Sequence, residues 1–217
     1  MIEYFILGLF FALLGVLLYA EAVENVKIRY VCMSTLMPLL ILYYYASVPF
    51  ASLNWLIVVA LIFGYFGDLF LMFRRDDFFI YGLGSFLVGH LFYIIAFLLS
   101  IDSLFTFPVW GLLFIIPSVP IILIVVKRTK GKLGKVKMPT YVYMGVIFLM
   151  GLCSVLRFAS FTSISFYLVW IGANLFMLSD GMIALNKFDK KIPYGEVWIK
   201  LTYVLAQFFI AQGFILG

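Results

Sequence analysis

The 217-residue sequence carries very little charge. Only 12% of its residues are Asp, Glu, Lys or Arg, whereas 66% are hydrophobic and 20% are aromatic. A soluble domain of this length could not bury so much apolar surface. The composition therefore excludes a soluble globular fold and indicates an integral membrane protein.

Cysteine and histidine are also scarce. Cys32 and Cys153 both lie in apolar runs, which favours free, packed thiols over a disulfide. His90 is the only histidine, so neither an H-E-x-x-H pair nor the multi-histidine site of many zinc hydrolases can be built. A metal held by Asp68, Asp180 and His90 together is the one arrangement left, and we expect no metal and no other cofactor.

Long polar segments are missing as well. The apolar runs are separated by short linkers, which leave no room for a soluble domain, so we expect residues 1–217 to form one transmembrane domain. Glu3 stands where a signal peptide would have a basic region, and we expect no cleavable signal peptide.

What is present is a series of apolar runs near the ~20 residues that cross ~30 Å of hydrocarbon. The alternating pattern of a membrane barrel is absent. The sequence therefore predicts an all-α, polytopic bundle of eight transmembrane helices. Their expected ranges are about 2–20, 30–48, 55–73, 78–99, 108–126, 138–157, 163–186 and 196–216.

The basic residues are distributed unevenly between the two sides of this bundle. Of fifteen Lys and Arg residues, fourteen fall on the side of the linkers after spans one, three, five and seven, and only Arg157 falls on the other. Because basic loops stay in the cytoplasm, both termini are expected outside and the loop Lys127–Lys137 inside. The protein would be multi-pass, in the cytoplasmic membrane if bacterial. The net charge of +5 is explained by attraction to anionic lipids, and we expect no nucleic-acid partner.

Two acidic residues lie inside the predicted spans. Asp68 precedes Arg74 by six residues and Asp180 precedes Lys187 by seven, which places both carboxyls about 10 Å inside the cytoplasmic boundary. An ionisable residue in a membrane span is costly and marks a candidate functional site. We therefore predict that the two acids line one cavity that opens toward the cytoplasm.

Other polar residues are predicted to surround these acids. His90 lies nearer the midplane, and Tyr203 and Gln207 share one face of the last span because they are four residues apart. Asn174 and Ser179 precede Asp180 in the same span. The alternative is that each acid is only a protonated or hydrogen-bonded residue that holds helices together. Small residues that allow close helix approach are Gly64, Gly67, Gly82, Ser85 and Gly89.

Four stretches resemble the YhhN family of membrane proteins, which includes the lysoplasmalogenases. They are FGDLFLMF (66–73), FFIYGLGSFLVGHLFYIIAF (78–97), LFMLSDGMIALNKF (175–188) and TYVLAQFFIAQG (202–213), with weaker agreement in MPTYVYMGVIFLM (138–150). Met37-Pro38 departs from the Lys-Pro that the family often has in its second span.

The resemblance implies a hydrolase that cleaves the vinyl ether bond of lysoplasmalogen and releases a fatty aldehyde and a glycerophospho-base. Its partners would be the lysophospholipid substrate, water and membrane lipids. Asp68 and Asp180 would be the catalytic acids, with basic residues such as Lys187 or Lys200 near the phosphate. The residues expected to orient the acids, water or substrate are His90, Tyr93, Tyr143, Asn174, Ser179, Tyr203 and Gln207.

Two other functions stay open. A transporter for a lipid or small solute could use the acids as a proton relay, and an internal repeat marked by Met37-Pro38 and Met138-Pro139 would favour it. The second is a non-catalytic membrane scaffold. Purified protein that forms aldehyde from lysoplasmalogen would separate the hydrolase from both.

Overall fold

The computed structural model describes residues 1–73, 76–161 and 163–217, and it contains helices but no strand within these residues. The α-helices are α1 (Ile2–Ala22), α2 (Val26–Ser47), α3 (Trp55–Met72), α4 (Asp76–Leu99), α5 (Ser118–Thr129), α6 (Lys137–Leu156), α7 (Ile164–Phe188) and α8 (Gly195–Ile215). Short 3-10 helices are η1 (Phe50–Ser52), η2 (Leu104–Thr106), η3 (Val109–Ile115), η4 (Gly134–Val136) and η5 (Arg157–Ala159).

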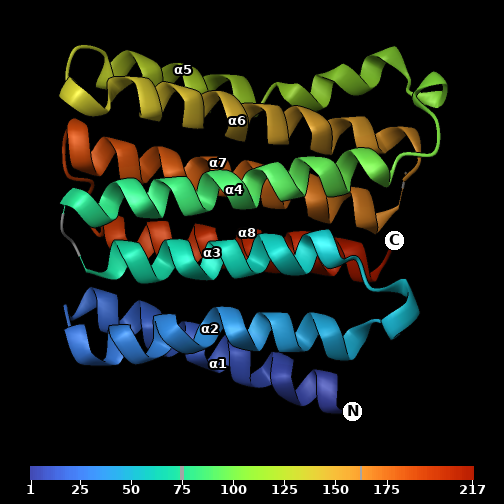
Figure 1. The fold of residues 1–217 in the computed structure, drawn as a ribbon, viewed down its shortest axis with the longest axis horizontal. Helices are drawn as coiled ribbons and strands as arrows, with labels where there is room; N and C mark the ends of the chain where they lie inside the picture. Colours follow the sequence, from blue (N-terminus) through green and yellow to red (C-terminus); the bar gives the residue numbers. More distant parts are fainter. Residues whose placement is uncertain (74–75, 162) are drawn as a thin grey trace. The chain divides into compact units, whose positions relative to one another are not determined.

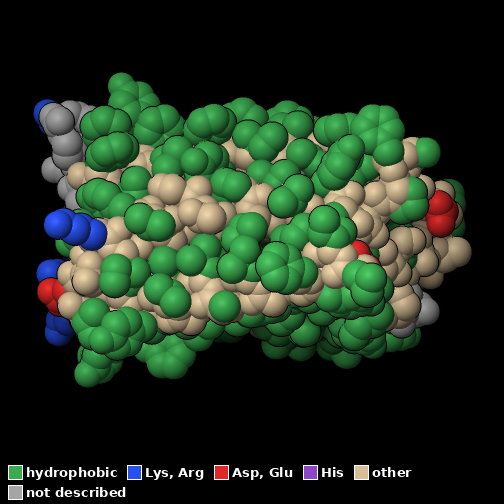
Figure 2. All heavy atoms as spheres, turned by 90° about the horizontal axis from the view of Figure 1, so that it is seen from below, with side chains coloured by type: hydrophobic (Ala, Val, Ile, Leu, Met, Phe, Trp, Pro, Cys, Tyr) green, Lys and Arg blue, Asp and Glu red, His purple; other side chains and the backbone are tan. Residues whose placement is uncertain are grey.

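Eight helical segments among the described residues are long and apolar enough to cross a membrane. The prediction of eight spans in a multi-pass membrane protein is therefore confirmed. Figure 2 shows hydrophobic side chains over most of the surface that it displays, as contact with lipid requires. The chain divides into two compact units, Met1–Tyr93 and Ile94–Gly217, with the division inside α4.

In the first unit, α1, α2 and α3 follow one another as antiparallel neighbours (Figure 1). Asn25 caps α2 by accepting a hydrogen bond from the Ile28 backbone at 3.2 Å, and Asn54 caps α3 in the same way through Leu56. These side chains satisfy backbone donors that a helix leaves open at its first turn.

Glycines bring α3 and α4 into close contact. A Cβ added at Gly67 would lie 2.7 Å from the Phe86 ring, and one at Gly89 would lie 3.2 Å from the Ala60 carbonyl oxygen. The Ser85 hydroxyl donates to the Phe63 carbonyl at 2.6 Å. The predicted small-residue contact between the third and fourth spans is therefore confirmed, and it holds the helix that carries Asp68 against the helix that carries His90.

In the second unit, α7 is the central helix, and it packs against α5, α6 and α8. A Cβ at Gly172 would lie 2.9 Å from the Ala206 carbonyl oxygen, and a Cβ at Gly213 would lie 2.9 Å from the Ser165 carbonyl oxygen. At these two glycines, the backbones of α7 and α8 therefore lie so close together that a larger residue would clash.

The fifth span differs from the continuous helix that was expected over 108–126. Its first half is the 3-10 helix η3 and its second half is α5, which begins after Pro117. Proline has no backbone N–H and interrupts the hydrogen-bond ladder of a helix. The Trp170 indole N–H on α7 donates to the Phe114 carbonyl at 2.9 Å. α7 therefore supplies a hydrogen-bond donor to a backbone carbonyl at this interruption.

The two Met-Pro pairs occupy different positions in their helices. Pro38 lies in the interior of α2, whereas Pro139 is the third residue of α6. Only the second position is one that proline tolerates without loss of an internal hydrogen bond. The pairs therefore do not mark equivalent sites of a structural repeat.

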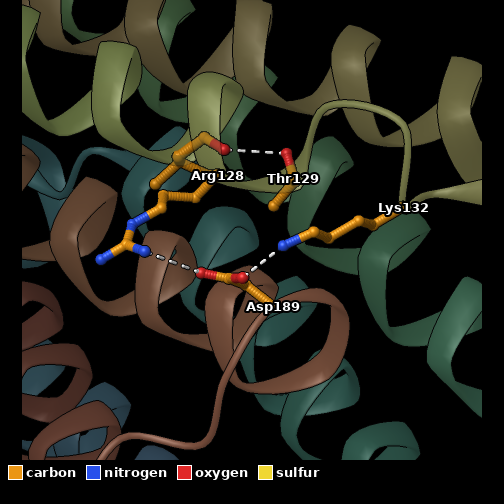
Figure 3. A network of polar contacts seen from close by, with 5 residues as sticks. Arg128, Thr129, Lys132 and Asp189 are labelled. Carbon is orange, nitrogen blue, oxygen red and sulfur yellow. Dashed lines mark hydrogen bonds and ion pairs between the residues drawn. The ribbon is translucent and has the colours of Figure 1, made fainter.

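Polar contacts define the two ends of the second unit. Asp189, just after α7, forms ion pairs with Lys132 at 2.5 Å and Arg128 at 3.7 Å, so the basic linkers that follow α5 and α7 lie at one end (Figure 3). At the other end, the Asp102 backbone donates to the Ser160 hydroxyl at 2.8 Å.

The predicted grouping of the basic linkers that follow α5 and α7 is confirmed, whereas the membrane side of each end stays a prediction. Arg74 and Arg75, which the same charge count included, lie outside the described residues.

Arg157 is the basic residue that was expected on the side opposite the other basic residues, and it is almost fully buried. Its guanidinium lies 4.4 Å from the centroid of the Phe214 ring and 4.5 Å from that of Phe161, and its Nε donates to the Ser100 hydroxyl at 2.9 Å. Aromatic faces attract a cation, and this attraction offsets part of the loss of hydration.

Candidate active site

Asp180 on α7 accepts a hydrogen bond from the phenol of Tyr143 on α6. Tyr143 is buried, and the Asp180 side chain is only partly exposed. Tyr203 on α8 is a neighbour of Tyr143. Three helices of the second unit therefore contribute to one polar group inside the membrane-spanning region. Asp180, Tyr143 and Tyr203 were all predicted site residues, and the structure brings them together.

One face of α8 continues this group. Lys200, Tyr203 and Gln207 are spaced by three and four residues, which places them on one side of the helix. The Gln207 amide donates to the Tyr203 hydroxyl at 3.3 Å, and the Lys200 ammonium lies 5.9 Å from the centroid of the Tyr203 ring. The rings of Phe176 on α7 and Tyr203 pack edge to face with their centroids 5.3 Å apart, which holds the Tyr203 ring against α7.

Asn174 and Ser179 make bonds that hold helices together. The Asn174 amide accepts from the Ser118 hydroxyl at 2.8 Å and donates to the Trp170 carbonyl at 2.9 Å, so it connects α7 to the start of α5. The Ser179 hydroxyl donates to the Ile199 carbonyl on α8 at 3.0 Å. Substrate contacts by these two residues stay a prediction, and the contacts described give both a structural role.

The first unit holds the other predicted site residues. Asp68 on α3 exposes 4% of its surface, and His90 and Tyr93 on α4 expose 1% each. His90 and Tyr93 are three residues apart and therefore share a face of α4. A buried carboxyl and a buried imidazole thus occur on two helices that the glycine contacts described above hold close together.

Two residues that take part in these groups were not predicted. Ser118 bonds to Asn174, and Tyr44 on α2 is a buried neighbour of Tyr93. Ser118 follows Pro117 in an apolar run, and Tyr44 lies in a run of three tyrosines, so neither residue stands out in the sequence. Only the tertiary contacts identify them.

The predicted site residues are thus divided between the two units. Asp68, His90 and Tyr93 belong to the first, and Tyr143, Asn174, Ser179, Asp180, Tyr203 and Gln207 belong to the second. That both acids line one cavity stays a prediction.

Comparison with known proteins gives a family for most of the chain. Residues 28–214 match the model of the YhhN family. The chain belongs to the YhhN family.

Curated relatives give the family match a biochemical context. The chain is 32% identical to lysoplasmalogenase TMEM86A of Bos taurus over 161 residues and 33% identical to lysoplasmalogenase TMEM86A of Homo sapiens over 164 residues. Each alignment covers 71% of this chain, and the chain spans 63% of the length of each relative. No solved structure matches the chain.

The family match includes every predicted site residue, because these fall between Asp68 and Gln207. It begins within α2 and ends within α8, so α1 lies outside it. The YhhN region of this chain is therefore the region that holds both Asp68 and Asp180.

Proposed function

We propose that the protein is a lysoplasmalogenase-like hydrolase that cleaves the vinyl ether bond of a lysoplasmalogen. The observation that carries the proposal is the intramembrane carboxyl of Asp180, which accepts a hydrogen bond from buried Tyr143 in a chain of the YhhN family. The relatives named lysoplasmalogenase support the reaction class. The buried carboxyl of Asp68 supplies the second acid.

A carboxyl pair suits this chemistry. A carboxylic acid protonates the alkene carbon remote from the ether oxygen, and the electron pair of the double bond forms the new C–H bond. The resulting oxocarbenium ion is stabilised by a carboxylate, much as glycosidases stabilise a similar cation. Water then adds to the carbon next to oxygen, and the hemiacetal breaks down to a fatty aldehyde and the alcohol of a glycerophospho-base. The proton released by the water restores the acid.

The residues around Asp180 have defined parts in this proposal. Tyr143 holds the carboxyl in one orientation, and the Tyr203–Gln207 pair orients the water or the substrate. In the first unit, His90 and Tyr93 do the same for Asp68. These residues act by positioning, because the proton transfer itself needs only the acids.

The test is isotopic analysis of the product made by purified protein from lysoplasmalogen. In heavy water, the mechanism places a single deuterium on the carbon next to the aldehyde group, because that proton comes from the catalytic acid. A phosphodiester or ester cleavage would leave this carbon unlabelled and would release no aldehyde. The absence of aldehyde under all lipid conditions would reject the proposal.

The interrupted fifth span favours one alternative. Many transporters build their substrate sites from discontinuous membrane helices, and η3 and α5 form such a helix here. A transporter would move labelled lysolipid across sealed vesicles without consuming it. Movement without aldehyde would select the transporter, and neither activity would leave a scaffold.

A further inference from the structure

Two of the arginines that the structure describes are buried, and only one of them has a counterion. Arg29 on α2 exposes 6% of its surface and lies 3.7 Å from the carboxylate of Glu21. Arg157 on η5 exposes 1%, and no carboxylate in the described part of the chain forms an ion pair with it. A guanidinium stays charged in proteins, so its burial without an anion is costly.

Aromatic rings offset part of this cost. The guanidinium carbon of Arg157 lies 4.4 Å from the centroid of the Phe214 ring, 4.5 Å from that of Phe161 and 6.0 Å from that of Phe97. The face of each ring attracts the positive charge. A ring face offers an N–H group only a weak acceptor, however, so the rings do not replace the oxygen atoms that a guanidinium bonds in water.

The N–H groups of Arg157 are only partly satisfied. Its Nε donates to the Ser100 hydroxyl at 2.9 Å, and that hydroxyl donates its own proton to the Phe97 carbonyl at 2.7 Å. The Nη1 atom is buried and has no hydrogen-bond partner among the described residues. The donors of a guanidinium lie in one plane and point outward from it. An acceptor for Nη1 must therefore approach in that plane, beside the contact with Ser100.

The surroundings limit what this acceptor is. All the groups named belong to the second unit, where the end of α4, η5 and α8 enclose the guanidinium. An almost unexposed site lined by aromatic rings disfavours an ion that must keep its hydration shell. A guanidinium is itself weakly hydrated, and the edges of aromatic rings are positive and attract anions. A compact anion with a single charge would balance the single charge of Arg157.

We infer that Arg157 forms the cationic part of a binding site for a small monovalent anion, for which chloride is the natural probe. Its occupant stabilises the second unit by supplying the charge that Glu21 supplies to Arg29 in the first. The inference does not depend on the proposed function. The competing interpretation is a buried water, which would satisfy Nη1 without neutralising the guanidinium.

The experiment measures the Tm of purified protein while sodium chloride replaces sodium gluconate at constant ionic strength. Chloride should raise the Tm of the wild type by a few degrees, and the rise should saturate, as binding to one site requires. Arg157→Gln keeps a side-chain N–H donor but loses the charge, and it should abolish the rise. Arg128→Gln is the matched control, because Arg128 is exposed and pairs with Asp189. It should keep the rise.

The absence of a saturable rise in wild-type protein would overturn the inference, as would an equal rise in Arg157→Gln. If Arg157→Gln does not fold, wild-type protein crystallised in bromide decides. Anomalous scattering should then place a bromide within hydrogen-bond distance of the Arg157 Nη1 atom. A water at that position, without anomalous signal, would show that Arg157 holds no anion.

Discussion

At the scale of single residues, Asp68 and Asp180 carry the proposed chemistry. Asp68→Asn and Asp180→Asn should each lower aldehyde release by at least ~100-fold, because asparagine keeps the shape of a protonated acid but cannot donate its proton or carry charge. Both variants should stay folded and bind lysolipid. Asp102→Asn, in an exposed loop, is the control and should be fully active. A smaller loss in either acid variant would assign that acid a structural role.

The variant Tyr143→Phe tests whether Tyr143 positions the Asp180 carboxyl. Removing its hydroxyl in Tyr143→Phe should lower kcat by roughly tenfold or more and leave KM nearly unchanged, since the phenol contacts the acid. Kinetics with purified protein give both constants. Tyr141→Phe, on the same helix, should have wild-type kinetics. A rise in KM at constant kcat would show that Tyr143 contacts the substrate instead.

At the scale of helices, the fifth span depends on α7. The Ser118–Asn174 and Trp170–Phe114 hydrogen bonds hold the interrupted span in place. A double-mutant cycle of Ser118→Ala and Asn174→Ala should give a coupling of about 0.6 to 2 kcal/mol in unfolding from detergent or bicelles. Thr35→Ala serves as a control, because the Thr35 hydroxyl donates to the Val31 carbonyl of its own helix at 2.8 Å. Additive effects of the two alanines would show that the bond does not couple the helices.

The Asp189 contacts connect two linkers and depend on pH. The hydrogen bond from Lys132, followed by the charges of Lys132, Arg128 and Lys190, lowers the pKa of Asp189. A carboxyl with a lowered pKa in the folded state stabilises the fold above its ordinary pKa of about 3.9. That contribution is lost as the pH falls through the lowered value.

The difference in Tm between wild type and Asp189→Asn should therefore stay constant from neutral pH to about pH 4 and shrink below it. Added salt should reduce the same difference, because these cations are exposed. A difference that persists unchanged at lower pH would mean that Asp189 acts through packing.

At the scale of the whole molecule, the orientation in the membrane is open to direct measurement. Fourteen of fifteen basic residues are expected on the cytoplasmic side, including the loop Lys127–Lys137. A protease site placed in this loop should be cut in inverted membrane vesicles and protected in intact cells. Cleavage from outside intact cells would contradict the assignment.

The sequence predicts the spans well because hydropathy reports directly on burial in lipid. It did not predict the interruption after Ile115, because an apolar run with Pro117 and Pro120 has the same hydropathy whether its backbone is α or 3-10. The acids stand out as charges in apolar runs. The partner of Asp180 does not, because Tyr143 is one of fourteen tyrosines and lies on another helix.

The polar face of α8 has a consequence for how the protein is made. Among the eight candidate spans, α8 has the lowest mean hydropathy, and the span formed by η3 and α5 has the highest. The translocon therefore accepts α8 least readily by itself, and Lys200 and Gln207 account for part of that penalty. α7 leaves the ribosome before α8 and offers Gly172 and Ser179, against which α8 packs. The two helices should therefore enter the bilayer together as a hairpin, because α8 is the span least favoured by itself.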